Sequence, residues 1–150
     1  MLLTDAFYNP VTGAGGMGAW LFLPGSGRLL YSYAPAHPWL MAWLASVAPK
    51  ETYVNQLELI AAVAAYRTYP ALLRDRLVHH FIDNQAARSA LIKGYSGRRD
   101  SAVIVGLMHT TLATLACHPW FGFVYSEDNG SDGPSRGDFQ LSQRLGGEFH

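Results

Sequence analysis

Four acidic residues occupy positions from which they could bind metal ions together. Asp5 lies in an apolar segment, Leu-Leu-Thr-Asp-Ala-Phe-Tyr, and Asp83 ends a second one, Phe-Ile-Asp. Glu58 lies in a stretch rich in Leu and Ala, and Asp132 lies in a Gly-rich C-terminal turn. A carboxylate in an apolar strand is costly to bury without a partner, and a divalent cation is the strongest partner available. We therefore interpret these four residues as candidate ligands of a two-metal site.

The donor types narrow the choice of metal. Carboxylate oxygens suit Mg²⁺ or Mn²⁺ better than Zn²⁺ or copper. Cys117 is the only cysteine, so a disulfide framework or a cysteine-rich zinc site is excluded. His79 and His80 are adjacent in an expected strand, where they face opposite sides and cannot hold one metal jointly. A pair of hard cations of this kind favours phosphate chemistry.

The elements that must position these residues follow from residue patterns and turn signals. We expect strands at 2–8, 18–23, 28–34, 77–82 and 120–125, and helices at 39–47, 53–69, 84–92 and 100–116. The order predicts an α/β fold with a mixed five-stranded sheet, in which three antiparallel strands precede two that run parallel to the first. Helices flank this sheet. Asp5 and Asp83 then lie toward the carboxyl ends of adjacent strands, where open sheets bind ligands.

The chain of 150 residues has the length of one domain. We expect that domain to cover residues 1–137. Residues 138–150 follow a polar, Gly-rich stretch, and we expect them to form a loosely ordered tail. There is no internal repeat that would indicate a second unit.

The charge balance is unusual for a protein that binds nucleic acid. Eleven Lys and Arg match eleven Asp and Glu, whereas neutralisation of phosphates by basic residues dominates such affinity. If metal ions offset four of the acids, the remaining surface is net basic, and its densest cluster is Lys93, Arg98 and Arg99. No apolar run of about 18 residues could span a membrane, so we expect no membrane contact and a soluble protein of the cytosol or nucleus.

Four motifs carry a resemblance to a known family. They are Asp5 in the first strand, Asn-x-x-Glu-Leu-x-Ala-Ala at 55–62, Asp-Asn-Gln at 83–85 and Asn-x-x-Asp-x-x-Ser-Arg at 129–136. Each motif alone is weak, but their order and their elements are specific. Together they resemble the ribonuclease H domains of retroelement and viral reverse transcriptases, above all the hepadnaviral branch. The resemblance spans residues 2–138.

The resemblance implies a ribonuclease H-like fold and endonucleolytic cleavage of the RNA strand of an RNA–DNA hybrid. Two Mg²⁺ ions, for which Mn²⁺ substitutes, would be held by Asp5, Glu58, Asp83 and Asp132. The hybrid-contacting positions of the family map onto Asn55, Asn84 and Gln85, and we add Lys93, Arg98 and Arg99 as candidate substrate-binding residues. The resemblance also implies a covalently linked polymerase domain in a parent protein and a place in a cell or in a viral or retroelement particle.

The chain departs from the cellular members of the family in two ways. Residues 124–129, before the last aspartate, contain no histidine, although cellular ribonucleases H use one there to assist product release. The long basic handle of cellular enzymes is also missing, and Lys93, Arg98 and Arg99 stand in its place. We therefore expect turnover that either is slow or depends on another group in place of the histidine. We also expect weak, salt-sensitive binding of hybrid by the isolated chain.

Alternative interpretations remain open at this stage. A DNA-directed nuclease or integrase-like phosphoryl transferase would use similar carboxylates, and a non-catalytic domain could keep the fold to bind nucleic acid or connect other domains. Among the residues, Asp128 could replace Asp132 as the fourth ligand. Asp83 could act as the N-cap of the helix that follows it. Glu58 alone could be a solvated helix residue, and Asp5 could be an edge-strand carboxylate that faces solvent.

Overall fold

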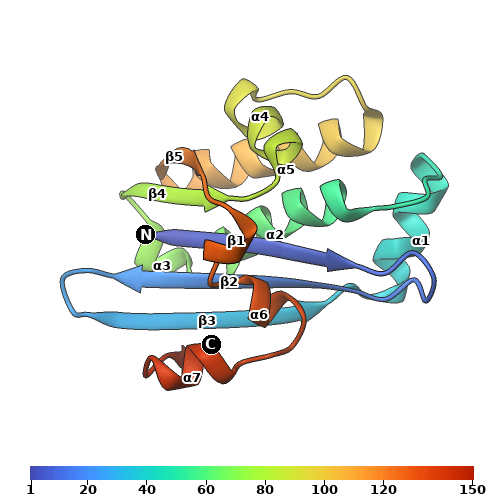
Figure 1. Cartoon of the computed structure of the whole chain (residues 1–150). Helices are drawn as coiled ribbons and strands as arrows, with labels where there is room; N and C mark the ends of the chain where they lie inside the picture. Colours follow the sequence, from blue (N-terminus) through green and yellow to red (C-terminus); the bar gives the residue numbers. More distant parts are fainter.

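A mixed sheet of six strands forms the centre of the structure, a computed structural model that describes residues 1–150 (Figure 1). The strand order across the sheet is β5-β4-β1-β2-β3-β6. The strands are β1 (Leu2–Tyr8), β2 (Gly15–Leu23), β3 (Arg28–Pro35), β4 (Leu77–Ile82), β5 (His118–Phe123) and β6 (Glu148–Phe149).

The pairing confirms the predicted α/β class and the mixed sheet. β1, β2 and β3 form an antiparallel meander, and β4 and β5 add parallel to β1 on its other side. The ladder between β1 and β4 has its last pair at Thr4 and Ile82. Asp5 and Asp83 are the next residues on each strand, so the sheet places both at the same edge of this ladder, as the predicted topology required.

The C-terminal segment differs from the prediction. Residues 138–150 were expected to form a loosely ordered tail, but they contain α7 (Gln140–Arg144) and the short β6, which pairs parallel to β3 and makes the sheet six-stranded rather than five-stranded. Phe139 and Phe149 each lie with their ring centroid 5.4 Å from that of Tyr31. The sequence did not reveal this order because the partners of the tail lie more than a hundred residues away.

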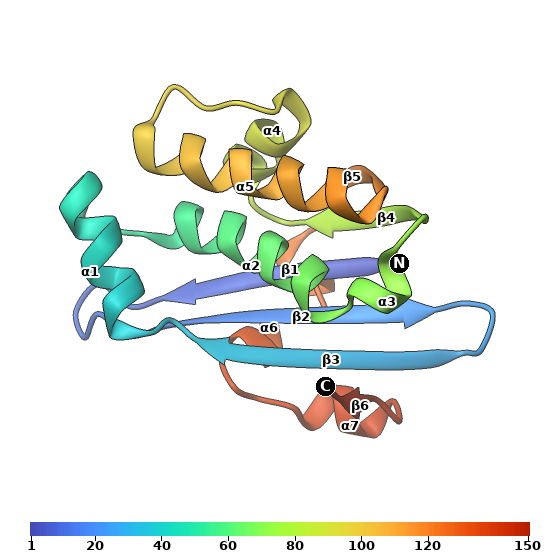
Figure 2. The same ribbon diagram turned by 180° about the vertical axis from the view of Figure 1, so that it is seen from behind.

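Helices cover both faces of the sheet. They are α1 (Pro38–Val47), α2 (Val54–Thr68), α3 (Pro70–Leu73), α4 (Gln85–Lys93), α5 (Arg99–Leu115), the 3₁₀ turn η1 (Ser126–Asp128), α6 (Asp132–Ser135) and α7. α2 packs across β1 and β2 and against α5 on one face, whereas α6 packs on β1, β2 and β3 on the other (Figures 1 and 2). None of these helices has both the length and the apolar character needed to cross a membrane.

β1 is buried on both faces, which explains why a carboxylate can be enclosed within it. Alternate side chains of a strand point to opposite faces. On the face of α2, a hydrogen bond of 2.8 Å joins Thr4 Oγ1 to His80 Nε2, and the other ring nitrogen of His80 lies 3.3 Å from the Tyr66 hydroxyl. On the opposite face, Asp5 meets Ser135 of α6. Asp5 therefore lies between two layers of protein.

Candidate metal centre

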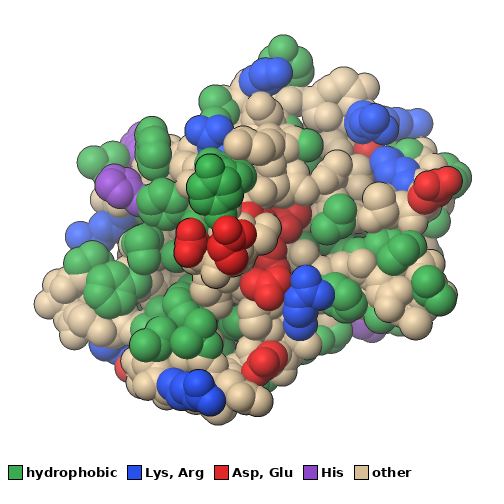
Figure 3. All heavy atoms as spheres, in the orientation of Figure 1, with side chains coloured by type: hydrophobic (Ala, Val, Ile, Leu, Met, Phe, Trp, Pro, Cys, Tyr) green, Lys and Arg blue, Asp and Glu red, His purple; other side chains and the backbone are tan.

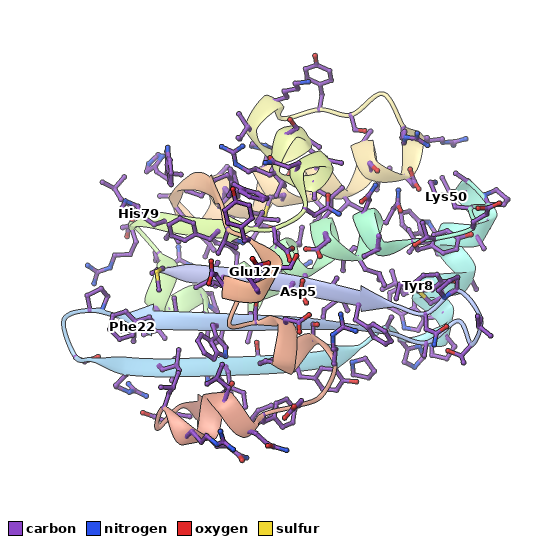
Figure 4. All side chains as sticks on the ribbon, in the orientation of Figure 1. Asp5, Tyr8, Phe22, Lys50, His79 and Glu127 are labelled. Atoms are coloured by element: carbon purple, nitrogen blue, oxygen red, sulfur yellow. The ribbon has the colours of Figure 1, made fainter.

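Three of the predicted ligands lie together in the structure. Asp5 comes from β1, Glu58 from α2 and Asp83 from the turn after β4, and one carboxylate oxygen of each lies within 4.8 Å of the others. Asp5 is 4% exposed and Glu58 2%, whereas Asp83 is partly buried. Figure 4 labels Asp5 on β1, and acidic side chains gather at the centre of the face that Figure 3 shows. We call Asp5, Glu58 and Asp83 the carboxylate cluster.

Glu58 reaches the cluster because the neighbouring strand pairing stops. β4 pairs with β1 only as far as Thr4, and the Ala6 backbone N–H donates instead to Glu58 Oε1 at 3.0 Å. The second oxygen, Oε2, is buried and has no hydrogen-bond partner. A buried polar atom without a partner costs stability, and a cation bound to the cluster would satisfy it. This unpaired oxygen and the all-oxygen donor set both fit a hard divalent ion.

The electrostatics of the cluster show a shortage of positive charge. The pKa of Asp5 is raised to about 6, chiefly by burial and also by the charges of Asp83 and Asp132, although the hydrogen bond from Ser135 opposes the shift. Burial also raises the pKa of Glu58 well above its usual range, with added repulsion from Asp5 and Asp83. Full ionisation of these carboxylates therefore calls for a positive partner, as the sequence predicted.

Asp132 lies beside the cluster but outside the group of three. It opens α6, and its Oδ1 accepts a hydrogen bond of 3.1 Å from Arg136 Nε. Its side chain is 44% exposed. Its charge nevertheless raises the pKa of Asp5, after the larger effects of burial and Asp83. The role of Asp132 as a fourth ligand stays a prediction, and so does the choice between Asp132 and the exposed Asp128 of η1.

The last motif is held on the sheet by hydrogen bonds that the sequence did not predict. Asn129 Nδ2 donates to the Thr4 carbonyl at 3.2 Å, and its Oδ1 accepts from Ser131 Oγ at 2.6 Å. Ser135 Oγ donates to Asp5 Oδ2 at 2.5 Å. Gly18 lies opposite Asp5 on β2, where any Cβ would collide with the Ser135 backbone nitrogen. Ser135 of the motif at 129–136 was the residue from which the sequence could have indicated a hydrogen bond to a metal ligand.

The two asparagines near Asp83 contact each other. Asn84 Nδ2 donates to Asn55 Oδ1 at 2.6 Å, and Asn84 Oδ1 accepts from the Ala87 N–H at 2.9 Å. Asn84, rather than Asp83, is therefore the N-cap of α4, so the capping alternative for Asp83 is wrong. The cap leaves the Asp83 carboxylate available to the cluster. Gln85 is exposed, and its Oε1 accepts from Arg88 Nη1 at 3.4 Å.

The predicted basic residues lie along the turn between α4 and α5. Lys93 ends α4, and Arg98 and Arg99 begin α5; all three are exposed. A hollow of about 310 Å³ is lined by Asn55 and Gln56 of α2 together with Ser96, Gly97 and Arg98. The structure thus links Asn55, which is one turn before Glu58, to the basic turn. The role of the six predicted substrate-binding residues stays a prediction.

Sequence comparison and structure comparison gave different results. No protein family and no curated protein matches the chain by sequence. Solved structures do match it. RNase H1 from the halophilic archaeon Halobacterium salinarum NRC-1 aligns with a TM-score of 0.71 at 15% identity and covers 95% of this chain and 96% of its own.

Two further structures give the same result. The N-terminal RNase H domain of Rv2228c from Mycobacterium tuberculosis, solved as a fusion with maltose binding protein, aligns with a TM-score of 0.69 at 11% identity and covers 97% of each chain. LC11-RNase H1, solved in complex with an RNA/DNA hybrid, aligns with a TM-score of 0.63 at 14% identity and covers 95% of this chain and 97% of its own. The chain therefore has a ribonuclease H-like fold, which confirms the fold that the motifs implied.

Proposed function

We propose that this chain is an endoribonuclease that hydrolyses the RNA strand of RNA–DNA hybrids with the help of divalent metal ions. One observation carries the proposal: a ribonuclease H-like fold brings Asp5, Glu58 and Asp83 to one point at the edge of its sheet. Function belongs to the site rather than to the fold, and the site here is a buried group of carboxylates without a basic partner. A structural neighbour, LC11-RNase H1, was solved with an RNA/DNA hybrid, which supports the choice of substrate.

The four carboxylates share one task in this proposal. Asp5, Glu58 and Asp83 would hold two Mg²⁺ ions, or Mn²⁺ in their place, and Asp132 would complete the set from α6. Divalent ions bound there would supply an activated water and neutralise charge on the reacting phosphate. Ser135 fixes the Asp5 carboxylate through its hydrogen bond, and the Ala6 N–H fixes that of Glu58. The ligands are thus oriented before any ion arrives.

The amide and basic side chains would hold the hybrid. Asn55, Asn84 and Gln85 lie next to Asp83 in the chain or in contact with that turn, where amides can meet the 2′-hydroxyl groups that distinguish RNA from DNA. Lys93, Arg98 and Arg99 would bind phosphates farther along the duplex. The motif at 129–136, which is similar to the hepadnaviral form, supports our further proposal that the chain serves a reverse transcriptase and is linked to a polymerase domain, in a cell or in a viral or retroelement particle.

A panel of labelled substrates tests the activity. RNA–DNA hybrid, double-stranded RNA and double-stranded DNA would each be incubated with Mg²⁺ or Mn²⁺, with and without chelator. We expect cleavage of the RNA strand of the hybrid only, and loss of cleavage with chelator. Cleavage of DNA would instead support an integrase-like phosphoryl transferase. Binding of hybrid with no cleavage in either ion would support a non-catalytic domain.

Two Asp→Asn substitutions, one at each end of β4, test whether Asp83 is needed for cleavage. Asp83→Asn removes a ligand from the cluster, and we expect it to reduce cleavage more than about a hundredfold, since even outer partners of metal ligands contribute roughly 10–100-fold. Asp75→Asn is the control, because Asp75 precedes β4 at its other end and Asn tolerates its φ of 56°. Parental cleavage by Asp83→Asn would refute the role of Asp83.

The fourth ligand needs a separate pair of variants. Asp132→Asn and Asp128→Asn change equivalent groups four residues apart, on α6 and η1. We expect Asp132→Asn to lower the cleavage rate and to raise the metal concentration needed for half-maximal cleavage. Asp128→Asn should leave both quantities near the parental level. The opposite result would assign the fourth ligand to Asp128.

A further inference from the structure

Arg136 lies beside the carboxylate cluster with most of its donors free. Its Nε donates to Asp132 Oδ1 at 3.1 Å, and its guanidinium carbon lies 5.0 Å from the centroid of the Phe7 ring. Nη1 and Nη2 make no hydrogen bond in the structure, and the side chain is 53% exposed. The guanidinium is thus held from one side and presents two donor nitrogens to solvent.

Both contacts tie Arg136 to the strand that carries Asp5. Phe7 is two residues beyond Asp5 on β1, so the two side chains share one face of the sheet. Ser135, the residue before Arg136, donates its hydroxyl proton to Asp5. The charge of Arg136 acts on Asp5 as well, opposite to the effect of burial on its pKa. These contacts with β1 and α6 fix the position of the Arg136 guanidinium relative to the cluster.

The charge balance of the proposed reaction leaves a place for one more cation. Two divalent ions would offset the four acidic residues, and the phosphodiester would then bring a negative charge of its own. The segment before α6 offers no cation, because η1 consists of Ser126, Glu127 and Asp128. In Figure 3 a basic side chain lies directly beside the central acidic group. Arginine matches the paired oxygens of a phosphate with its planar fork of donors.

We propose that Arg136 binds a non-bridging oxygen of the substrate phosphate at or next to the cleaved linkage, through Nη1 and Nη2. Asp132 and Phe7 position the guanidinium for this contact. The proposal rests on the proposed function and names one of its substrate-binding residues. It also gives the Ser-Arg pair of the last motif two separate tasks: Ser135 orients a ligand, and Arg136 holds the substrate.

Binding measurements on the Asp83→Asn chain, in which we expect cleavage to fall more than about a hundredfold, test the contact with little turnover. Arg136→Gln should weaken binding of an RNA–DNA hybrid at least about tenfold and reduce the slope of log affinity against log salt by about one. Arg136→Lys should keep the slope but lose part of the affinity, because it keeps the charge without the fork. Arg28→Gln is the matched control, since Arg28 is equally exposed and also pairs with a carboxylate, Glu148, on β6.

A chemical substitution in the substrate identifies the phosphate. Hybrids would carry a single neutral methylphosphonate linkage, placed in turn at each position around the cleavage site. At one position, the difference in affinity between the chain that keeps Arg136 and the chain that carries R136Q should disappear. If no position removes the difference, or if the salt slope of R136Q is unchanged, the proposed contact is refuted.

The proposed function can fail separately from this contact. A parental chain that neither binds nor cleaves hybrid overturns the proposed function. A parental chain that cleaves hybrid while R136Q keeps the parental kcat, KM and salt slope overturns only the role of Arg136. The Tm of R136Q should stay close to that of R28Q. Equal Tm values would show that weaker binding by R136Q reflects a lost substrate contact and not a loss of structure.

Discussion

Two buried carboxylate sites in this protein are built in opposite ways. Asp100, at the start of α5, is fully buried, and its carboxylate accepts from Lys50 Nζ at 2.5 Å and from the Ser101 N–H at 2.8 Å. The carboxylate cluster is equally enclosed at Glu58, but no Lys or Arg pairs with it and Glu58 Oε2 has no partner at all. The protein supplies a directly paired cation at the first site, whereas Arg136, the basic residue beside the second, pairs with Asp132 outside the cluster.

The pKa values follow this difference. Burial acts to raise the pKa of Asp100, but the hydrogen bonds from Lys50 and Ser101 outweigh it and hold the pKa below its usual range. At Asp5 burial prevails, and the pKa rises to about 6. The same kind of side chain is therefore stabilised as an anion in one region and destabilised in the other. The comparison teaches that a missing partner, rather than burial itself, marks the site for an external cation.

Removing Lys50 should have the largest effect on stability. Lys50→Met leaves Asp100 buried without its partner, and we expect the free energy of unfolding to fall by about 3–5 kcal/mol at neutral pH. Chemical denaturation measures this loss. The double variant Lys50→Met/Asp100→Asn should recover most of it, because the remaining group is neutral. An unchanged stability of Lys50→Met would mean that the Lys50–Asp100 pair does not compensate the buried charge.

The pH dependence of stability should have opposite signs at the two sites. The folded pKa of Asp5 exceeds its unfolded value of about 4, so its contribution is fully present below that pH and is lost as the pH rises through about 6. This loss should amount to roughly 2–3 kcal/mol in chelator. The Asp100 contribution is instead lost as the pH falls through its lowered pKa.

Unfolding measurements between about pH 4 and pH 7 in chelator, on the parental chain and on Asp5→Asn, check this sign. Asp5→Asn should remove part of the decline in stability with rising pH. Asp100→Asn should leave that decline in place and lower stability at neutral pH. A decline that persists in full in Asp5→Asn would show that ionisation of Asp5 is not its source.

Divalent ions bound to the cluster should change the free energy of unfolding by less than Lys50→Met or the pH does. An ion at about ten times its dissociation constant adds about 1.4 kcal/mol to the free energy of unfolding of a single-site protein. We expect Mg²⁺ or Mn²⁺ to raise the Tm of the parental chain and of Lys50→Met by similar amounts, and to leave the Tm of Asp83→Asn nearly unchanged. An equal rise in Asp83→Asn would place the ion elsewhere.

The exposed ion pair between Arg28 and Glu148 should have the smallest effect. Both side chains are about half exposed, and solvent and salt screen such pairs. We expect Arg28→Gln to change the Tm little, and any change to vanish at high salt. A large shift would show that the pairing of β6 with β3 depends on this contact and not on the aromatic packing of Phe149.

Local sequence determined a large part of the fold. The strands between Pro and Gly turns and the Ala-rich segment that became α2 depend on neighbours within a few residues, and their order was confirmed. The bounds of two strands differ most from the prediction, because β2 begins at Gly15 rather than residue 18 and β5 covers His118–Phe123 rather than 120–125. The crossover order also implied parallel β4 beside β1, which put Asp5, Glu58 and Asp83 near one another. Motif resemblance supplied the fold family, which the structural neighbours confirm, whereas its reverse-transcriptase branch remains a proposal.

Only the tertiary structure decided which groups have partners. The bond from Ser135 to Asp5 spans 130 residues, and β6 places Phe149 against the Tyr31 ring of β3. The choice of Asn84 over Asp83 as the helix cap was equally invisible, because both types favour that position. Composition and order along the chain determine which side chains carry charge. Their burial and pairing depend on contacts between distant segments, which form only when the whole chain folds.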